Sequence, residues 1–141
     1  LGDRDGNAPT VRTRGGVTLT TVDMQAGELT TETGGTTLTI NSGQANLDSG
    51  AWTTINARGG DVRHSSLLTI TTLNISGGAV ADFTRSQQAC TVTTCNIYEG
   101  ASIIDPYRRV TWTNGINLNQ CAVSDVSLDL GENIKLTPAN L

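Results

Sequence analysis

Charged and aromatic side chains are scarce in this 141-residue chain. Charged residues make up 16% of it and aromatic residues 4%, and the net charge is −4. No apolar run approaches the roughly 18 residues that a membrane-spanning helix needs, so we expect no membrane partner. The arginines Arg58, Arg63, Arg108 and Arg109 are dispersed among acids rather than gathered in a basic stripe. We therefore expect no nucleic-acid partner either.

Histidine and cysteine are equally few. The single histidine, His64, lies in the segment Asp61–Ser65, which we interpret as a polar turn, and no second ligand accompanies it. A metal or catalytic role is therefore not expected, and we expect no cofactor. The odd cysteine count, with Cys90, Cys95 and Cys121, does not make a complete disulfide framework. We expect Cys95 to be a buried thiol, although a Cys95–Cys121 or Cys90–Cys95 bridge is conceivable.

Glycine, threonine and asparagine are plentiful instead. These residues have low helix propensity, and they suit short strands that are separated by turns. Such a composition also occurs in disordered chains, but here valine, isoleucine and leucine recur in phase. We therefore expect one folded domain of short strands.

One motif recurs along the chain: a small polar residue, then an apolar residue, then usually asparagine. Steps between successive apolar members range from 15 residues (Ile40 to Ile55) to 22 residues (Leu73 to Cys95). A repeat of this length is typical of a stacked solenoid. The sequence therefore predicts an all-β fold, a right-handed parallel β-helix (β-solenoid) of about six coils. The apolar members are Val22, Ile40, Ile55, Leu73, Cys95, Ile116 and Ile134.

Strand alternation predicts where these residues point. If the apolar members face inward, the residues that follow them face outward, and stacked coils place them in one exterior row. Asp23 and Lys135 would stand at the two ends of that row. The row could hold the coils together through amide hydrogen bonds, or it could offer a polar face to a sugar or a protein. Its predicted members are Asn41, Asn56, Asn74, Asn96 and Asn117.

The two ends of the chain differ from the repeats. Residues 1–16 contain little apolar content, and we interpret them as an extended arm or linker, or else as a frayed terminus. Arg12 and Arg14 in this arm are candidate partner contacts. Residues 17–141 form the predicted solenoid, and its last segment, 131–141, would cap the stack.

Four acids are candidates for sugar chemistry, because enzymes on β-helices use carboxylates on the outside of the coils. Outward acids occur on any soluble strand protein, and no arginine or lysine pairs with these in a catalytic pattern. We therefore expect a protein that is not an enzyme. The four acids are Asp105, Asp125, Asp129 and Glu132.

Four aromatic residues are candidates for sugar stacking or for anchoring an interface, namely Trp52, Tyr98, Tyr107 and Trp112. Trp112 follows the alternation of Val110 and should point inward. Tyr107 lies in a turn beside Pro106, so it is the better surface candidate, and Arg108 follows it as a further candidate contact.

Three segments resemble repeat-containing β-solenoid virion proteins of tailed bacteriophages: Leu73–Val80, Cys95–Ser102 and Val110–Leu118. The resemblance implies a non-enzymatic virion structural protein. It favours a capsid decoration (cement) protein on the head surface, a homotrimer that contacts the major capsid protein or another virion protein. The alternative is a tail fibre or spike receptor-binding domain, or another carbohydrate-binding adhesin, with a surface glycan as partner. Similar repeats also occur in bacterial autotransporter adhesins.

Overall fold

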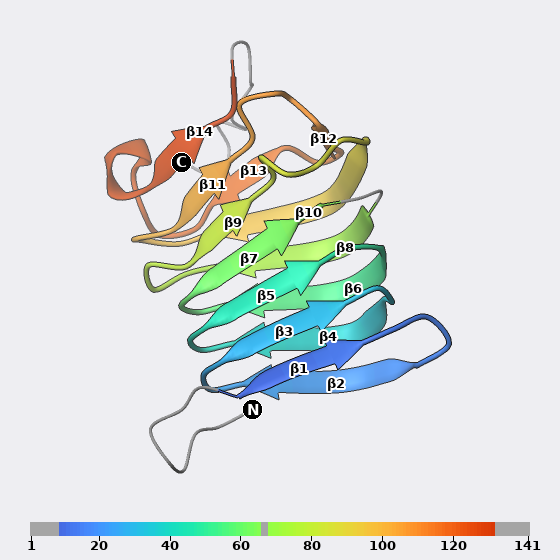
Figure 1. Cartoon of the computed structure of the whole chain (residues 1–141). Coiled ribbons are helices and arrows are strands. Elements are labelled where there is room, and N and C mark those ends of the chain that lie inside the picture. The colour runs from blue at the N-terminus through green and yellow to red at the C-terminus, as the bar shows by residue number, and fades with distance from the viewer. Residues whose placement is uncertain (1–8, 66–67, 132–141) are drawn as a thin grey trace.

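The chain folds into a parallel β-solenoid of about six coils, which confirms the predicted fold class. The computed structural model describes residues 9–65 and 68–131. Figure 1 shows the coils stacked one on the next, with the first strands at one end of the stack and β14 at the other. Each of the first five coils contributes one strand to each of two sheets, and every strand pairs in parallel with its counterpart in the next coil.

Within residues 9–65 and 68–131, the first sheet, which we call sheet A, has seven strands. They are β1 (Thr10–Thr13), β3 (Glu28–Thr31), β5 (Gln44–Leu47), β7 (Asp61–His64), β9 (Val80–Asp82), β11 (Ser102–Ile104) and β14 (Ser127–Asp129). The second sheet, sheet B, also has seven. They are β2 (Leu19–Met24), β4 (Gly35–Ile40), β6 (Gly50–Ala57), β8 (Leu68–Ile75), β10 (Cys90–Ile97), β12 (Val110–Trp112) and β13 (Ile116–Leu118). β12 and β13 pair with the two halves of β10.

The core lies between the two sheets and consists of aliphatic columns in register. On sheet B, Leu38, Ile55, Leu73, Cys95 and Ile116 occupy equivalent positions, and all five are fully buried. Burying one such aliphatic side chain stabilises the fold by roughly 1.5–3 kcal/mol. A single coil cannot bury its own apolar face, so its neighbours supply the cover, as expected for a solenoid.

Threonine pairs interrupt strict alternation on sheet B. In β6, Trp52 and Ile55 are both buried, so Thr53 and Thr54 between them both lie on the outer side of the strand. Four neighbouring strands repeat the pair, so this break in the alternation is aligned along the stack. One outward column therefore consists of threonine in five successive coils: Thr21, Thr37, Thr54, Thr72 and Thr94.

Stacked glycines form one corner of the solenoid, where sheet B turns into sheet A. Gly27, Gly43 and Gly60 all adopt positive φ, of 92°, 94° and 71°. A Cβ on Gly43 would collide with the carbonyl oxygen of Gly27, and a Cβ on Gly60 would collide with that of Gly43. Glycine is required here for both reasons, because other residues disfavour this conformation and would not fit.

The stack begins earlier than the boundary that the sequence predicted. β1 lies inside residues 1–16, the predicted arm, and pairs with β3 in parallel register, Val11 beside Leu29. Val11 is half-buried against the core and is the only apolar residue of β1. At the other end, a 3-10 turn at Val123–Asp125 precedes β14. Most of the predicted cap lies outside the described residues.

Candidate functional site

The predicted asparagine row exists for four of its five members. Asn56, Asn74, Asn96 and Asn117 stand in register on neighbouring coils and are half-exposed. Three of the side-chain amides donate to the asparagine oxygen of the preceding coil: Asn117 to Asn96 at 3.1 Å, Asn96 to Asn74 at 2.9 Å, and Asn74 to Asn56 at 2.9 Å. We call these four residues the asparagine ladder.

Asn41 does not belong to the ladder, so this part of the prediction was wrong. Thr39 stands beside Asn56, and Asp23 stands beside Thr39, because the register pairs Leu38, not Ile40, with Ile55. Asn41 lies just beyond β4 and donates instead to Asp23 Oδ1 at 3.0 Å. Asp23 does lie in the row, as predicted, whereas Lys135 lies outside the described residues.

The ladder favours the structural interpretation of the row. The three hydrogen bonds run in the same direction along the stack, an arrangement in which hydrogen bonds polarise and strengthen one another. Each such bond contributes about 0.5–1.5 kcal/mol net. The donors of Asn74 and Asn96 are thus engaged in joining coils, which leaves less hydrogen-bonding capacity for a ligand.

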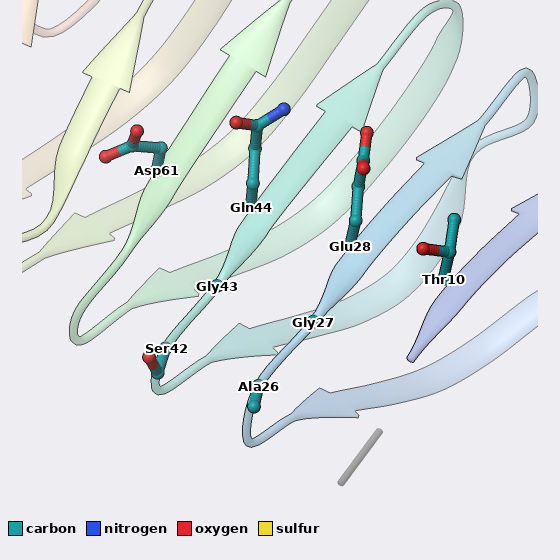
Figure 2. A pocket seen from close by; sticks show the side chains of 8 residues that line it. All are labelled: Thr10, Ala26, Gly27, Glu28, Ser42, Gly43, Gln44 and Asp61. Atoms are coloured by element: carbon teal, nitrogen blue, oxygen red, sulfur yellow. The ribbon is translucent and has the colours of Figure 1, made fainter. Parts of the chain in front are cut away.

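A shallow groove of about 570 Å³ runs across the first residues of β1, β3, β5 and β7 in sheet A, beside the glycine corner. Figure 2 shows Thr10, Glu28, Gln44 and Asp61 projecting from four successive strands on the same side. The corner residues Ala26, Gly27, Ser42 and Gly43 complete the lining. This groove was not predicted, although a second repeat in the sequence indicates it. Gly27-Glu28, Gly43-Gln44 and Gly60-Asp61 form a glycine–polar repeat.

The polar groups of the groove are tied to one another. Asn46 Nδ2 donates to Glu28 Oε1 at 2.7 Å, and Gln44 Nε2 donates to Asn46 Oδ1 at 2.9 Å. Arg63 Nη2 forms an ion pair with Asp61 Oδ2 at 3.6 Å. These contacts hold carboxylate and amide groups in fixed positions along an open surface, which suits hydrogen bonding to a hydroxyl-rich ligand.

Asp105 is not an exterior carboxylate, contrary to the prediction. It is buried, with 1% exposure, and its oxygens accept hydrogen bonds from the backbone N–H groups of Arg109 at 2.9 Å and Val110 at 3.1 Å. Burial raises the pKa of this carboxyl, while the two backbone hydrogen bonds and Arg109 act to lower it. The role of Asp105 is therefore to hold a turn. Asp125 and Asp129 are exposed, as predicted, and Glu132 lies outside the described residues.

The turn that Asp105 holds carries two of the predicted contact residues. Tyr107 is 66% exposed, and Arg108 is exposed with a positive φ of 54°. Arg108 N also donates to the carbonyl oxygen of Asp105 at 3.1 Å, which closes the turn. A non-glycine residue in the left-handed region is uncommon and strained.

The other aromatic candidates divide between core and surface. Trp52 is 1% exposed and packs over Gly35, where a Cβ would lie 2.6 Å from its ring, so its predicted surface role was wrong. Trp112 is half-buried against the core, as predicted. Tyr98 is exposed at the turn after β10.

The neighbours of His64 in the sequence suggested a polar turn, and this interpretation was wrong. His64 is a core residue. It ends β7, is fully buried, and stacks on Phe83 with ring centroids 4.1 Å apart. Trp112 meets Phe83 edge-on at 5.7 Å. Among the described residues, neither ring nitrogen of His64 has a hydrogen-bond partner. Burial lowers the pKa of His64 to about 3, against a smaller opposing effect of Asp82.

All three cysteines are free thiols. Cys95 is fully buried in the aliphatic column, which confirms its predicted role. Burial raises the pKa of Cys90 to about 12 and that of Cys95 further still. Cys121 is half-buried, and its Sγ lies 3.8 Å from the carbonyl oxygen of Ile97.

Arg12 and Arg14, the two candidate contact residues of the predicted arm, lie on the first coil. Arg12 belongs to β1 and forms a 3.4 Å ion pair with Glu32. Both side chains of this pair are exposed, so it adds little stability. Arg14 follows β1 and is exposed. The structure does not bring either of them near Tyr107, because β1 and β11 lie five coils apart in sheet A.

No protein-family model, curated protein or solved structure matches this chain. Residues 9–65 and 68–131 include no helix of the length and apolarity needed to cross a membrane. The same residues contain no cluster of three or more side chains that could hold a metal ion.

Proposed function

We propose that this chain is a non-enzymatic structural protein of a bacteriophage particle, and specifically a decoration protein on the head surface. The proposal starts from the resemblance of its repeats to virion solenoid proteins. The main structural support is that polar side chains form hydrogen bonds that stabilise the fold. The asparagine ladder joins coils, and the buried carboxylate of Asp105 holds a turn. This use of polar groups favours a rigid building element over a reactive centre.

In the proposed particle, the chain is a homotrimer that contacts the major capsid protein or another virion protein. Contacts are assigned to the ends and turns of the solenoid, where exposed side chains depart from the regular repeats. Arg12 and Arg14 lie at the first coil, and Tyr107 and Arg108 lie near the last.

Copy number and position test this proposal. Purified particles from the source phage would be labelled with an antibody against the chain and examined by electron microscopy, and quantitative mass spectrometry would count copies. Hundreds of copies distributed over the head are expected. A few copies confined to the tail, or none on the particle, would overturn head decoration.

A second candidate function is a receptor-binding module of a tail fibre or spike that contacts a surface glycan. The groove on sheet A favours it, since Glu28, Gln44 and Asp61 offer fixed acceptors and donors along an open path. A glycan array would test it with the double variant Glu28→Ala/Asp61→Ala. Loss of a glycan signal in this variant supports the module, and absence of any signal from the unmodified chain counts against it.

The non-enzyme assignment has its own test. The chain would be incubated with bacterial surface polysaccharides, and the length of the polymers would be followed by size-exclusion chromatography. No shortening is expected. Depolymerisation that disappears in Asp125→Asn would overturn the assignment.

A further inference from the structure

Two neighbouring loops bring together arginines that are dispersed in the sequence. One loop, residues 83–89, joins β9 to β10, and the other, residues 105–109, joins β11 to β12 in the next coil. Backbone hydrogen bonds join the two coils where these loops begin and end, from Phe83 N to Ile104 O at 2.8 Å and from Cys90 N to Arg109 O at 2.9 Å. Arg85 therefore lies on the loop beside the one that carries Arg108. We call the exposed residues Arg85, Tyr107, Arg108 and Arg109 the arginine–tyrosine corner.

Both loops are held rigid from within. Besides the contacts of Asp105, Asp82 Oδ1 accepts from Thr84 N at 2.8 Å and from Thr84 Oγ1 at 2.6 Å. The buried Ser86 donates to the carbonyl oxygen of Gln88 at 2.8 Å. These bonds fix the backbone on either side of Arg85 and Arg108. A preorganised surface loses less conformational entropy on binding, so its contacts contribute more to affinity.

The charge of the corner is unbalanced at its tip. Residues 84–89 and 106–109 carry three arginines and no acid. Three acids lie close to these segments. Asp82 and Asp105 accept hydrogen bonds from their own loops, and the exposed Asp129 stands beside Ile104 on β14. Within the described part of the chain, neither Arg85 nor Arg108 forms an ion pair. Exposed tyrosine and arginine together are the residue types enriched where proteins bind one another.

We propose that the arginine–tyrosine corner is a docking surface for an acidic protein segment, whose carboxylates pair with the guanidinium groups. Guanidinium and carboxylate match in shape and can form two parallel hydrogen bonds. A nucleic acid is the less favoured occupant, because phosphate-backbone binding commonly uses about six to ten cationic contacts and this corner has fewer. The inference deepens the proposed function, since it names the chemistry of the partner surface.

Strain at Arg108 supports a binding role. Glycine adopts positive φ without cost, and ten other positive-φ positions of the described chain are glycine. Only Arg108 and Gln120 are exceptions. Strained backbone positions of this kind cluster at functional sites, so an arginine at a position that favours glycine points to a role for its side chain.

The test uses the full chain and an immobilised deca-glutamate peptide, with deca-glutamine and a short DNA duplex as comparison surfaces. The unmodified chain is expected to bind deca-glutamate most tightly, with affinity falling as salt rises. Arg108→Gly and Arg85→Gln are each expected to weaken binding at least fivefold. Arg108→Gly should melt at the same temperature as the unmodified chain or higher, since it removes backbone strain.

Two matched controls separate binding from folding and from total charge. Gln120→Gly makes the same backbone change in a turn outside the corner, and Arg58→Gln removes one exposed charge elsewhere. Both should bind like the unmodified chain. Three results would each overturn the inference. They are unchanged binding of Arg108→Gly to deca-glutamate, tighter binding of the unmodified chain to DNA than to deca-glutamate, and a lowered melting temperature in a variant that loses binding. If the chain is absent from phage heads, the decoration proposal is wrong, but the result of the deca-glutamate binding measurement is unaffected.

Discussion

Acid should destabilise this fold through one residue, His64. The folded chain keeps the imidazole neutral, because the ring is fully buried and its pKa is lowered from 6.5 to about 3. The unfolded chain takes up a proton below pH 6.5. Stability from this residue is therefore complete above about pH 6.5 and is lost as the pH falls towards 3.

The size of the effect follows from the two pKa values. Each pH unit between 6.5 and about 3 corresponds to about 1.4 kcal/mol, which gives about 5 kcal/mol over the whole interval. At pH 5 the expected loss is about 2 kcal/mol. For a domain of this size, that lowers the melting temperature by about 6 °C.

Thermal unfolding at pH 7.5 and pH 5.0 would measure the loss, with His64→Leu as the comparison. Leucine suits the site, because Leu47 occupies the equivalent position in the preceding coil. The variant should melt at nearly the same temperature at both pH values. It should be no less stable at pH 7.5, since it removes two buried nitrogen atoms that lack partners.

A second measurement addresses the ionisation directly. His64 is the only histidine, so its imidazole signals in a proton NMR spectrum are unambiguous. These signals should not titrate between pH 7.5 and 4.5 while the chain is folded. A midpoint near 6.5, or equal losses of melting temperature in the variant and the unmodified chain, would refute the reasoning.

Three further changes test the stack. Asn74→Ala removes two ladder hydrogen bonds and should cost about 1–3 kcal/mol in urea unfolding, and no loss would mean that the ladder is not structural. Gly35→Ala places a Cβ 2.6 Å from the Trp52 ring and should lower the melting temperature by at least several degrees, whereas Gly15→Ala, with open space around it, should not. In the native chain, a thiol reagent should modify Cys121 first, and the two buried thiols should react only after unfolding, so equal reaction rates would contradict their burial.

The sequence repeat predicted most, but not all, of the residues in the asparagine row. The spacing of Asn56, Asn74 and Asn96 predicted their alignment correctly, because each follows an apolar residue that faces the core. The same rule failed at Asn41. Leu38 and Ile40 are both buried and suit the inward column equally well, so the motif alone could not say which one pairs with Ile55.

The candidate sites were less predictable than the fold. Tyr107 could be assigned to the surface because it lies beside Pro106 in a turn. Asp105 lies in the same turn, two residues before Tyr107, and yet is buried, since its carboxylate satisfies two backbone N–H groups. A hydrogen bond from a side chain to the backbone leaves no periodic trace in the sequence.

The sequence by itself determined that this chain is a parallel stack of β-coils. Local strand preference and a repeated apolar position are properties of each coil, and they can be read one coil at a time. Only the tertiary structure decided which residues meet across coils. The stacking of His64 on Phe83, the groove beside Glu28, and the placement of the Arg85 loop beside the Arg108 loop depend on register and on loop length. Those two properties are set by packing between coils, so residues that are about twenty positions apart become neighbours whose chemistry no single repeat displays.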